Sequence, residues 1–275
     1  MPGLPSTGPA STGAPRPSAG PPAAGPGRGL AKGLLLLGAG GLAVLLLLVL
    51  GTWQVHRLRW KLDLIASVDA RVRSAPVAPP GPAAWPGISA EADQYRHVAL
   101  RGTFDNDRET LVQAVTDLGA GFWVMTPLRA DAGFTVLVNR GFVPGDRRAP
   151  ATRAAGQVAG DTAVTGLLRV TEPGGAFLRH NDPADDRWYS RDVAAIAAKR
   201  GLAGPVAPYF IDADATPNPG GLPVGGLTVI AFPNNHLVYA VTWYALAAML
   251  AGALAWAVRE ERRARRRPGP PMPVG

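Results

Sequence analysis

The side chain with the clearest potential for chemistry is His236, which stands where a long apolar run begins. An imidazole is a common metal ligand and titrates near neutral pH, so this boundary is an unusual place for one. Tyr239 and Trp243 follow at i+3 and i+7, which puts the three side chains on one helix face. One ligating nitrogen would then lie beside two aromatic rings. The competing interpretation is an ordinary belt of interfacial aromatics, with His236 only capping the helix or reaching to water.

Two apolar runs of equal length, residues 34–55 and 237–258, contain no charged residue. At about 1.5 Å of rise per residue, each would form roughly 33 Å of helix, against a hydrocarbon core of about 30 Å. Both can therefore cross a membrane. A cleaved signal peptide has a shorter apolar region that ends in small residues. The first run ends instead at Thr52, Trp53 and Gln54, so we expect a retained anchor.

The basic excess of the chain lies at its two ends. The formal net charge is +8, which in another setting would suggest nucleic-acid binding. Most of it comes from residues 1–33, a Pro/Gly-rich tail that we expect to be disordered, and from the arginine-rich residues 259–275. The positive-inside rule then predicts two cytoplasmic tails and an extracytoplasmic domain over residues 56–236, although basic residues after the first run oppose it. We expect a two-pass protein of a bacterial plasma (inner) membrane, with a periplasmic central domain and no nucleic-acid partner.

The region between the runs has the pattern of a β domain. Short stretches of β-branched and apolar residues alternate with Gly, Asp and Pro, which is typical of antiparallel strands. The predicted strands are residues 95–104, 109–115, 122–129, 134–143, 163–170, 209–212 and 227–232. A helix is predicted over residues 192–200, with Ser190 or Asp192 as its N-cap. The predicted fold class is two transmembrane helices flanking a mainly antiparallel β domain, a small barrel or sandwich with one short helix.

The two apolar helices are expected to pack on each other through small residues, because close backbone approach stabilises helix pairs in lipid. The residues concerned are Gly38, Gly40 and Gly41 in the first helix and Ala245, Ala248, Gly252 and Ala255 in the second. The first helix should continue beyond the membrane and end before the prolines of residues 76–86. Packing against a partner subunit would use the same physics.

Composition disfavours several other kinds of site. The chain has no cysteine, which excludes disulfides and thiolate ligands, and its four methionines are scattered, unlike those of a copper carrier. Asp182, Asp185 and Asp186 cluster near His180, but the segment that holds them is typical of a solvated loop. We therefore expect neither a hydrolytic site nor any other enzyme activity.

Three segments resemble the surfeit locus protein family. Residues 51–61 are similar to its first-helix pattern Gly-x-Trp-Gln-x-x-Arg-x-x-x-Lys. Residues 138–144 read Val-Asn-Arg-Gly-Phe-Val-Pro, with Phe142 where the family usually has Trp. Residues 234–244, Asn-Asn-His-Leu-Val-Tyr-Ala-Val-Thr-Trp-Tyr, are similar to the start of its second helix. The resemblance covers roughly residues 51–247.

The resemblance implies an assembly factor for haem-copper cytochrome c oxidase that holds or presents haem a for insertion into the catalytic subunit. The haem a synthesis machinery is a further expected partner, and the membrane lipid surrounds the anchor. The family's haem-binding histidine falls on His236, and Tyr239 and Trp243 would line the macrocycle. Arg57 and Arg140 are candidate partners for the haem propionates, because a guanidinium binds a carboxylate through two hydrogen bonds.

Two alternatives stay open at the level of sequence. His56 lies at the same predicted membrane face as His236, so two imidazoles would be able to clasp one iron. The second alternative is a cofactor-free scaffold, in which the β domain binds an oxidase subunit and the helices serve only as anchors.

Overall fold

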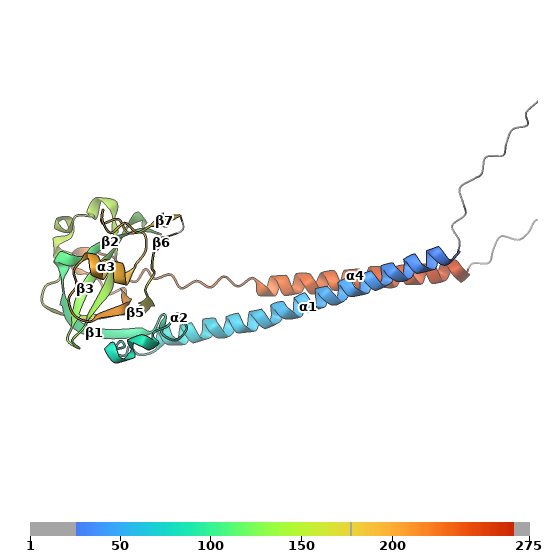
Figure 1. The fold of residues 1–275 in the computed structure, drawn as a ribbon, viewed down its shortest axis with the longest axis horizontal. Coiled ribbons are helices and arrows are strands. Elements are labelled where there is room, and N and C mark those ends of the chain that lie inside the picture. The colour runs from blue at the N-terminus through green and yellow to red at the C-terminus, as the bar shows by residue number, and fades with distance from the viewer. Residues whose placement is uncertain (1–25, 177, 267–275) are drawn as a thin grey trace, which may run out of the picture. The chain divides into compact units, whose positions relative to one another are not determined.

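A computed structural model describes residues 26–176 and 178–266, with side chains from residue 32 onward. The chain forms two compact units. One comprises the described residues up to 57 and from 235 onward, and the other is Leu58–Asn234. The first contains the paired helices and the second contains the β domain (Figure 1).

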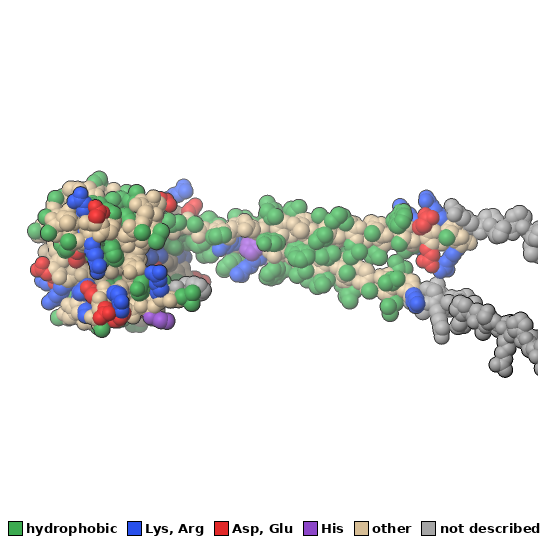
Figure 2. Space-filling view, turned by 90° about the horizontal axis from the view of Figure 1, so that it is seen from above, with side chains coloured by type: hydrophobic (Ala, Val, Ile, Leu, Met, Phe, Trp, Pro, Cys, Tyr) green, Lys and Arg blue, Asp and Glu red, His purple; other side chains and the backbone are tan. Residues whose placement is uncertain are grey.

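Within the residues that the structure describes, two helices are long and apolar enough to cross a membrane: α1 (Pro26–Arg73) and α4 (His236–Arg266). The share of the most apolar stretch that is buried inside the structure is 0% for α1 and 11% for α4. A core helix of a soluble protein would be mostly buried, whereas Figure 2 shows hydrophobic side chains over the outer surface of the pair. These observations indicate a membrane protein. Helix α1 also continues beyond its apolar run and ends before the proline-rich segment, as predicted.

The two helices lie antiparallel and contact each other along one face of each (Figure 1). Partly or fully buried positions recur at alternating intervals of four and three residues, as in a coiled coil. They are Gly33, Leu37, Gly40, Val44, Leu47, Gly51 and Gln54 in α1, and His236, Ala240, Trp243, Ala247, Leu250 and Leu254 in α4. We call this contact the helix seam.

Glycines on α1 allow large side chains of α4 to approach its backbone. A Cβ built on Gly40 would lie 2.7 Å from a methyl carbon of Leu254, and one on Gly51 would lie 2.9 Å from the ring of Tyr244. Such close approach gives membrane helices their dispersion contacts. Gly38 and Gly41, also predicted to face α4, instead meet nothing within 4 Å.

The predicted small-residue stripe on α4 is wrong in phase. Its four members, Ala245, Ala248, Gly252 and Ala255, are all exposed. The physical reason is complementarity: because α1 supplies the glycines, α4 fits bulky residues opposite them and alternates these with Ala240 and Ala247. Small residues therefore line the seam on both helices, but on α4 they are Ala240 and Ala247 and not the four predicted positions.

The β domain is a closed five-stranded barrel. Its strands follow the order β1 (His97–Phe104), β5 (Asp161–Val170), β8 (Val206–Ala213), β4 (Thr135–Pro144) and β3 (Gly119–Ala130). Pairing of β1 with β3 closes the barrel, and β2 (Thr110–Thr116) extends the sheet from β3. All of these pairs are antiparallel except β4 with β8. Of the two predicted architectures, the barrel is the one found.

Shorter elements surround the barrel. They are α2 (Ala90–Asp93), α3 (Val193–Lys199), the hairpin of β6 (Gly175–Ala176) and β7 (Arg179–His180), and 3-10 turns at Pro82–Gly87, Asn106–Arg108, Gly145–Arg147, Pro150–Gly156 and Pro219–Gly221. Helix α3 begins as predicted, because Asp192 caps it by accepting a hydrogen bond from the backbone N of Ala195 at 3.1 Å. Such a cap stabilises a helix by about 1 kcal/mol.

The predicted strand over residues 227–232 is wrong, because this segment has no regular structure. The barrel closes through β1 and β3, so it offers no edge for a further strand at that point. Thr228 instead donates from its hydroxyl to Asp212 at 3.0 Å, which ties the segment to the end of β8.

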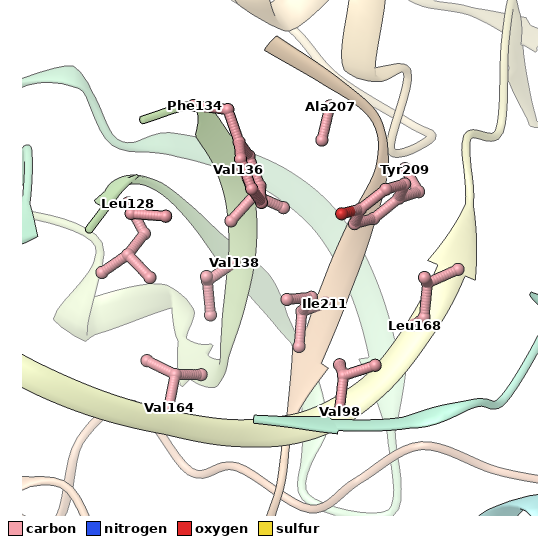
Figure 3. Packing of buried hydrophobic residues seen from close by; sticks show 11 residues of the cluster. Val98, Leu128, Phe134, Val136, Val138, Val164, Leu168, Ala207, Tyr209 and Ile211 are labelled. Carbon is pink, nitrogen blue, oxygen red and sulfur yellow. The ribbon is translucent and has the colours of Figure 1, made fainter. Parts of the chain in front are cut away.

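The barrel interior is filled by aliphatic side chains from facing strands (Figure 3). Val98, Leu168 and Ile211 are fully buried there, and each contributes about 1.5–3 kcal/mol through removal of its surface from water. A second apolar cluster lies around Trp188 and joins α3 to the sheet through Ile196. The two clusters give the β domain a hydrophobic core of its own.

The helix seam predicts a specific cross-link. Leu254 Cγ, which marks where a cysteine sulfur at 254 would lie, is 3.4 Å from a Cβ built on Gly40. Because the chain has no cysteine, we expect the double variant Gly40→Cys/Leu254→Cys to form an intramolecular disulfide on mild oxidation in membranes. Gly41→Cys/Leu254→Cys is the matched control, since position 41 faces open space. Equal cross-linking of both pairs, measured by non-reducing gel mobility, would contradict the seam.

Candidate functional site

His236 is the first residue of α4 and occupies the end of the helix seam. Its Nδ1 lies 2.8 Å from Oε1 of Gln54, and Gln54 is only 9% exposed. The helix starts beyond Pro233, and the backbone N of Tyr239 donates to the carbonyl of Asn235 at 3.2 Å. The irregular segment before α4 therefore ends at His236, whose imidazole lies against the buried amide of Gln54 in α1.

Gln54 was not among the predicted site residues. Its signal in the sequence was weak but present, since it is an uncharged polar residue near the end of an otherwise apolar run. A buried amide without a partner costs several kcal/mol in an apolar setting, so such a residue requires a hydrogen-bonding partner. The structure supplies that partner on α4, which no pattern within one helix can reveal.

The two predicted aromatic neighbours of His236 differ in how deeply they are buried. Trp243 is partly buried in the seam, two helical turns after His236. Tyr239 is 53% exposed and lies on the flank of the pair. Tyr244 was not predicted as a site residue, yet its hydroxyl lies 3.0 Å from that of Thr52 in α1. The aromatic surface near His236 is therefore partly in the seam and partly exposed.

The polar residues that follow Gln54 in α1 point in different directions. At about 100° per residue, Arg57 lies roughly 60° around the helix from Gln54, whereas His56 lies roughly 160° away. Both side chains are exposed. Arg57 is thus on the edge of the seam near His236, and His56 is on the opposite side of α1. This arrangement disfavours the clasp of one iron by two histidines.

Arg140 lies in the β domain, and its guanidinium is already engaged by partners there. Its guanidinium donates from Nη2 to the carbonyl of Gly156 at 2.5 Å and to Oδ1 of Asn218 at 3.0 Å. It also lies over the ring of Phe104, 4.7 Å from the ring centre, and the residue is 2% exposed. Burial lowers the pKa of Arg140 to about 10. The predicted role toward a propionate would require this guanidinium to give up partners that it already has.

The motif around Arg140 has a clear backbone reason for its glycine. Gly141 adopts a φ of 125°, which disfavours any side chain, and a Cβ there would collide with the carbonyl of Val224. The neighbouring Phe142 exchanges two backbone hydrogen bonds with Val224, at 2.8 and 2.9 Å. The motif therefore fixes the crossing of β4 with the segment after β8.

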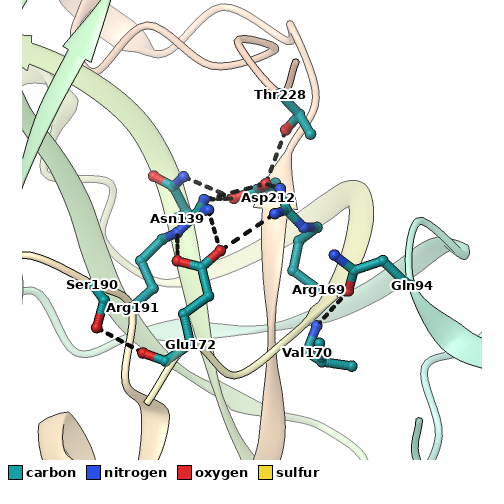
Figure 4. Close-up of polar contacts among 9 residues, drawn as sticks. All are labelled: Gln94, Asn139, Arg169, Val170, Glu172, Ser190, Arg191, Asp212 and Thr228. Carbon is teal, nitrogen blue, oxygen red and sulfur yellow. Dashed lines mark hydrogen bonds and ion pairs between the residues drawn. The ribbon is translucent and has the colours of Figure 1, made fainter. Parts of the chain in front are cut away.

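A second polar cluster, shown in Figure 4, was not predicted from the sequence. Asp212 is 3% exposed and accepts hydrogen bonds from Asn139, Arg169 and Arg191 at 2.8, 2.8 and 3.1 Å. Glu172 contacts both arginines. Burial opposes the charge of Arg191, but the two acids outweigh it and raise its pKa. The charges balance, so the cluster is suited to joining β4, β5 and β8 rather than to binding a charged ligand.

The acidic loop near His180 is likewise held by arginines. Arg187 pairs with Asp182 at 2.8 Å and with Asp185 at 2.9 Å. The hydrogen bond from Arg187 lowers the pKa of Asp182. Asp186 pairs with Arg200 at 2.7 Å. Within the described residues, no group of three or more His, Cys, Asp or Glu side chains is placed to hold a metal ion.

The comparisons with known proteins point in one direction. The model of the SURF1 family matches residues 41–248. Surfeit locus protein 1 of Rattus norvegicus is 40% identical over 215 residues, covering 72% of this chain and 68% of the rat protein. Surfeit locus protein 1 of Homo sapiens is 38% identical over 216 residues, covering 72% and 69% respectively. A SURF1-like protein of Monosiga brevicollis is 41% identical over 215 residues, covering 73% and 78%.

The contacts of Arg140 predict that lysine cannot replace it. A lysine keeps the charge but loses the planar fork that reaches Gly156 and Asn218 and the stacking on Phe104. We expect Arg140→Lys to lower the free energy of unfolding by about 2 kcal/mol, measured by urea titration in detergent with tryptophan fluorescence. Arg129→Lys, on a side chain that is 66% exposed, should change it by less than about 0.5 kcal/mol. Equal stability of both variants would contradict the structural role.

Proposed function

The chain belongs to the SURF1 family, and on that premise we propose that it is an assembly factor for a haem-copper cytochrome c oxidase. In this role it holds haem a as cargo and presents it for insertion into the catalytic subunit. The observation that supports the proposal most directly is the position of His236. It is an imidazole at the end of the helix seam, with Nδ1 engaged by Gln54 and a second ring nitrogen left for a ligand.

The residues around His236 fit the chemistry of a haem. Haem iron binds an imidazole nitrogen, the macrocycle needs apolar and aromatic surroundings, and the propionates favour a guanidinium. His236, Trp243 and Arg57 supply these three groups within one unit of the structure. Tyr239 adds an exposed ring on the flank. Arg140 lies in the other unit and is buried there, so we assign it to the barrel and not to the propionates.

A single protein ligand suits a carrier better than a permanent haem site. His236 would hold the iron of a bound haem through a single imidazole nitrogen, so release would require the loss of that one bond. The seam beside His236 is filled by Gln54 and Ala240, which are 9% and 2% exposed. A porphyrin bound to His236 would therefore lie against the outside of the pair, where a receiving subunit would reach it through the membrane.

The proposed setting is a bacterial plasma membrane. Both tails are cytoplasmic in this proposal, and the barrel lies on the outer side, where it binds the catalytic subunit. The protein would accept haem a from the synthesis machinery, would catalyse no reaction itself and would bind no nucleic acid. The rival function is a scaffold that carries no haem, in which the barrel alone recognises an oxidase subunit.

Absorption spectra of the full-length protein, purified from cells that make haem a, test the cargo role. We expect a Soret band for the natural sequence and at least a tenfold smaller band for His236→Ala. His180→Ala is the matched control, because His180 is exposed on β7, in the short hairpin of the β domain. It should retain the full band. Absence of a Soret band above background in the natural sequence would favour the scaffold.

Thiol labelling tests the orientation, again because the chain has no cysteine. Val115→Cys places a thiol on β2 of the β domain, at a site that is 86% exposed, and Ala264→Cys places one in the basic end of α4. We expect a membrane-impermeant maleimide to label the first but not the second in spheroplasts, and both after lysis. The reverse pattern would place the barrel in the cytoplasm and refute the proposed route.

A further inference from the structure

Gln54 lies three residues after Gly51 at the end of the helix seam, and its amide contacts His236 directly. We propose that Gln54 is a positioning residue, which holds the proton on Nδ1 of His236 and so presents Nε2 as the atom that binds iron. This inference rests on the proposed haem-carrying function and assigns a partner residue to its ligand.

The chemistry follows from the limited choices of a neutral imidazole. One ring nitrogen carries a proton and donates, while the other has a lone pair and accepts. The atom of Gln54 that faces the ring at 2.8 Å is the amide oxygen Oε1, which only accepts. In this orientation of the amide, Nδ1 is the protonated nitrogen and Nε2 keeps the lone pair. Metal-ligating histidines commonly donate their other N–H to an oxygen in this way.

The position of His236 makes such a partner necessary. As the first residue of α4, it has no preceding helical turn of its own helix against which the ring can pack. The ring would then be free to rotate about its side-chain bonds and to exchange tautomers. A hydrogen bond from the opposite helix fixes both the direction of the ring and the location of its proton. The orientation of the His236 ring thus depends on both helices, although the residue belongs to α4 alone.

The same pair of helices contains a natural control for a purely structural role. The hydroxyl of Thr52 lies 3.0 Å from that of Tyr244, two residues before Gln54 in α1. This is also a polar contact between α1 and α4, but it does not involve His236. If Gln54 only fastened the helices together, removal of either contact would have a similar effect on haem binding.

The test uses full-length protein in detergent, titrated with haem a, and measures the dissociation constant, the visible spectrum and the midpoint reduction potential. Gln54→Met keeps the volume but removes the acceptor, and we expect about 10–100-fold weaker binding with an altered spectrum. Gln54→Glu keeps an acceptor, so it should restore binding. It should also lower the midpoint potential, because an ionised carboxylate makes the imidazole a stronger electron donor. Thr52→Val should match the natural sequence in all three measurements.

The outcomes separate this inference from the function on which it rests. Undiminished binding by His236→Ala would refute the proposed haem ligand itself. Loss of binding in His236→Ala together with natural affinity, spectrum and potential in Gln54→Met would overturn the role of Gln54 alone. Equal losses in Gln54→Met and Thr52→Val, or failure of Gln54→Glu to restore binding, would also overturn it, because the contact would then only hold the helices together.

Discussion

Two helices that cross lipid gain little by burying apolar surface against each other, because lipid tails are as apolar as leucine. Their association depends instead on close packing and on polar contacts that lipid cannot replace. In this chain, glycines of α1 receive Leu254 and Tyr244, and Gln54 meets His236 at the end of the seam. The packing sets the register of the helices. That register in turn decides which residue of α1 faces the imidazole.

The barrel meets a different constraint, since its polar groups must be satisfied around a compact aliphatic core. Arg140 holds the segments at Gly156 and Asn218, and Asp212 gathers arginines from β5 and from the segment before α3. Both clusters are deeply buried and depend on charge-assisted hydrogen bonds, which are about twice as strong as neutral ones. Buried charged side chains of this kind suggest a binding site when they are seen in a sequence. Here they hold strands and loops of the barrel together. A rigid β domain is the physical result.

Much of this architecture was predictable because it depends on local patterns. The length of the apolar runs predicted both long helices, and the alternation of β-branched stretches with turn residues predicted most barrel strands. A capping aspartate predicted the start of α3. The phase of the seam was not predictable, since it depends on which α1 glycine faces which α4 side chain. Residues 227–232 were mistaken for a strand because their composition suits one, although barrel closure leaves them no partner. Gln54 was missed for a similar reason, as its significance comes from a residue far along the chain.

For the proposed haem-carrying function, the location of His236 suits a carrier better than a permanent haem protein. A permanent site in a helix bundle needs a cavity wide enough for the macrocycle, with ligands directed inward from several helices. Here only two helices are paired, and their seam is closed by Ala240, which is 2% exposed. A ligand at the end of such a seam can hold a flat apolar molecule only from one side. In the proposed function, the remaining surface of that molecule would be available to the protein that receives it.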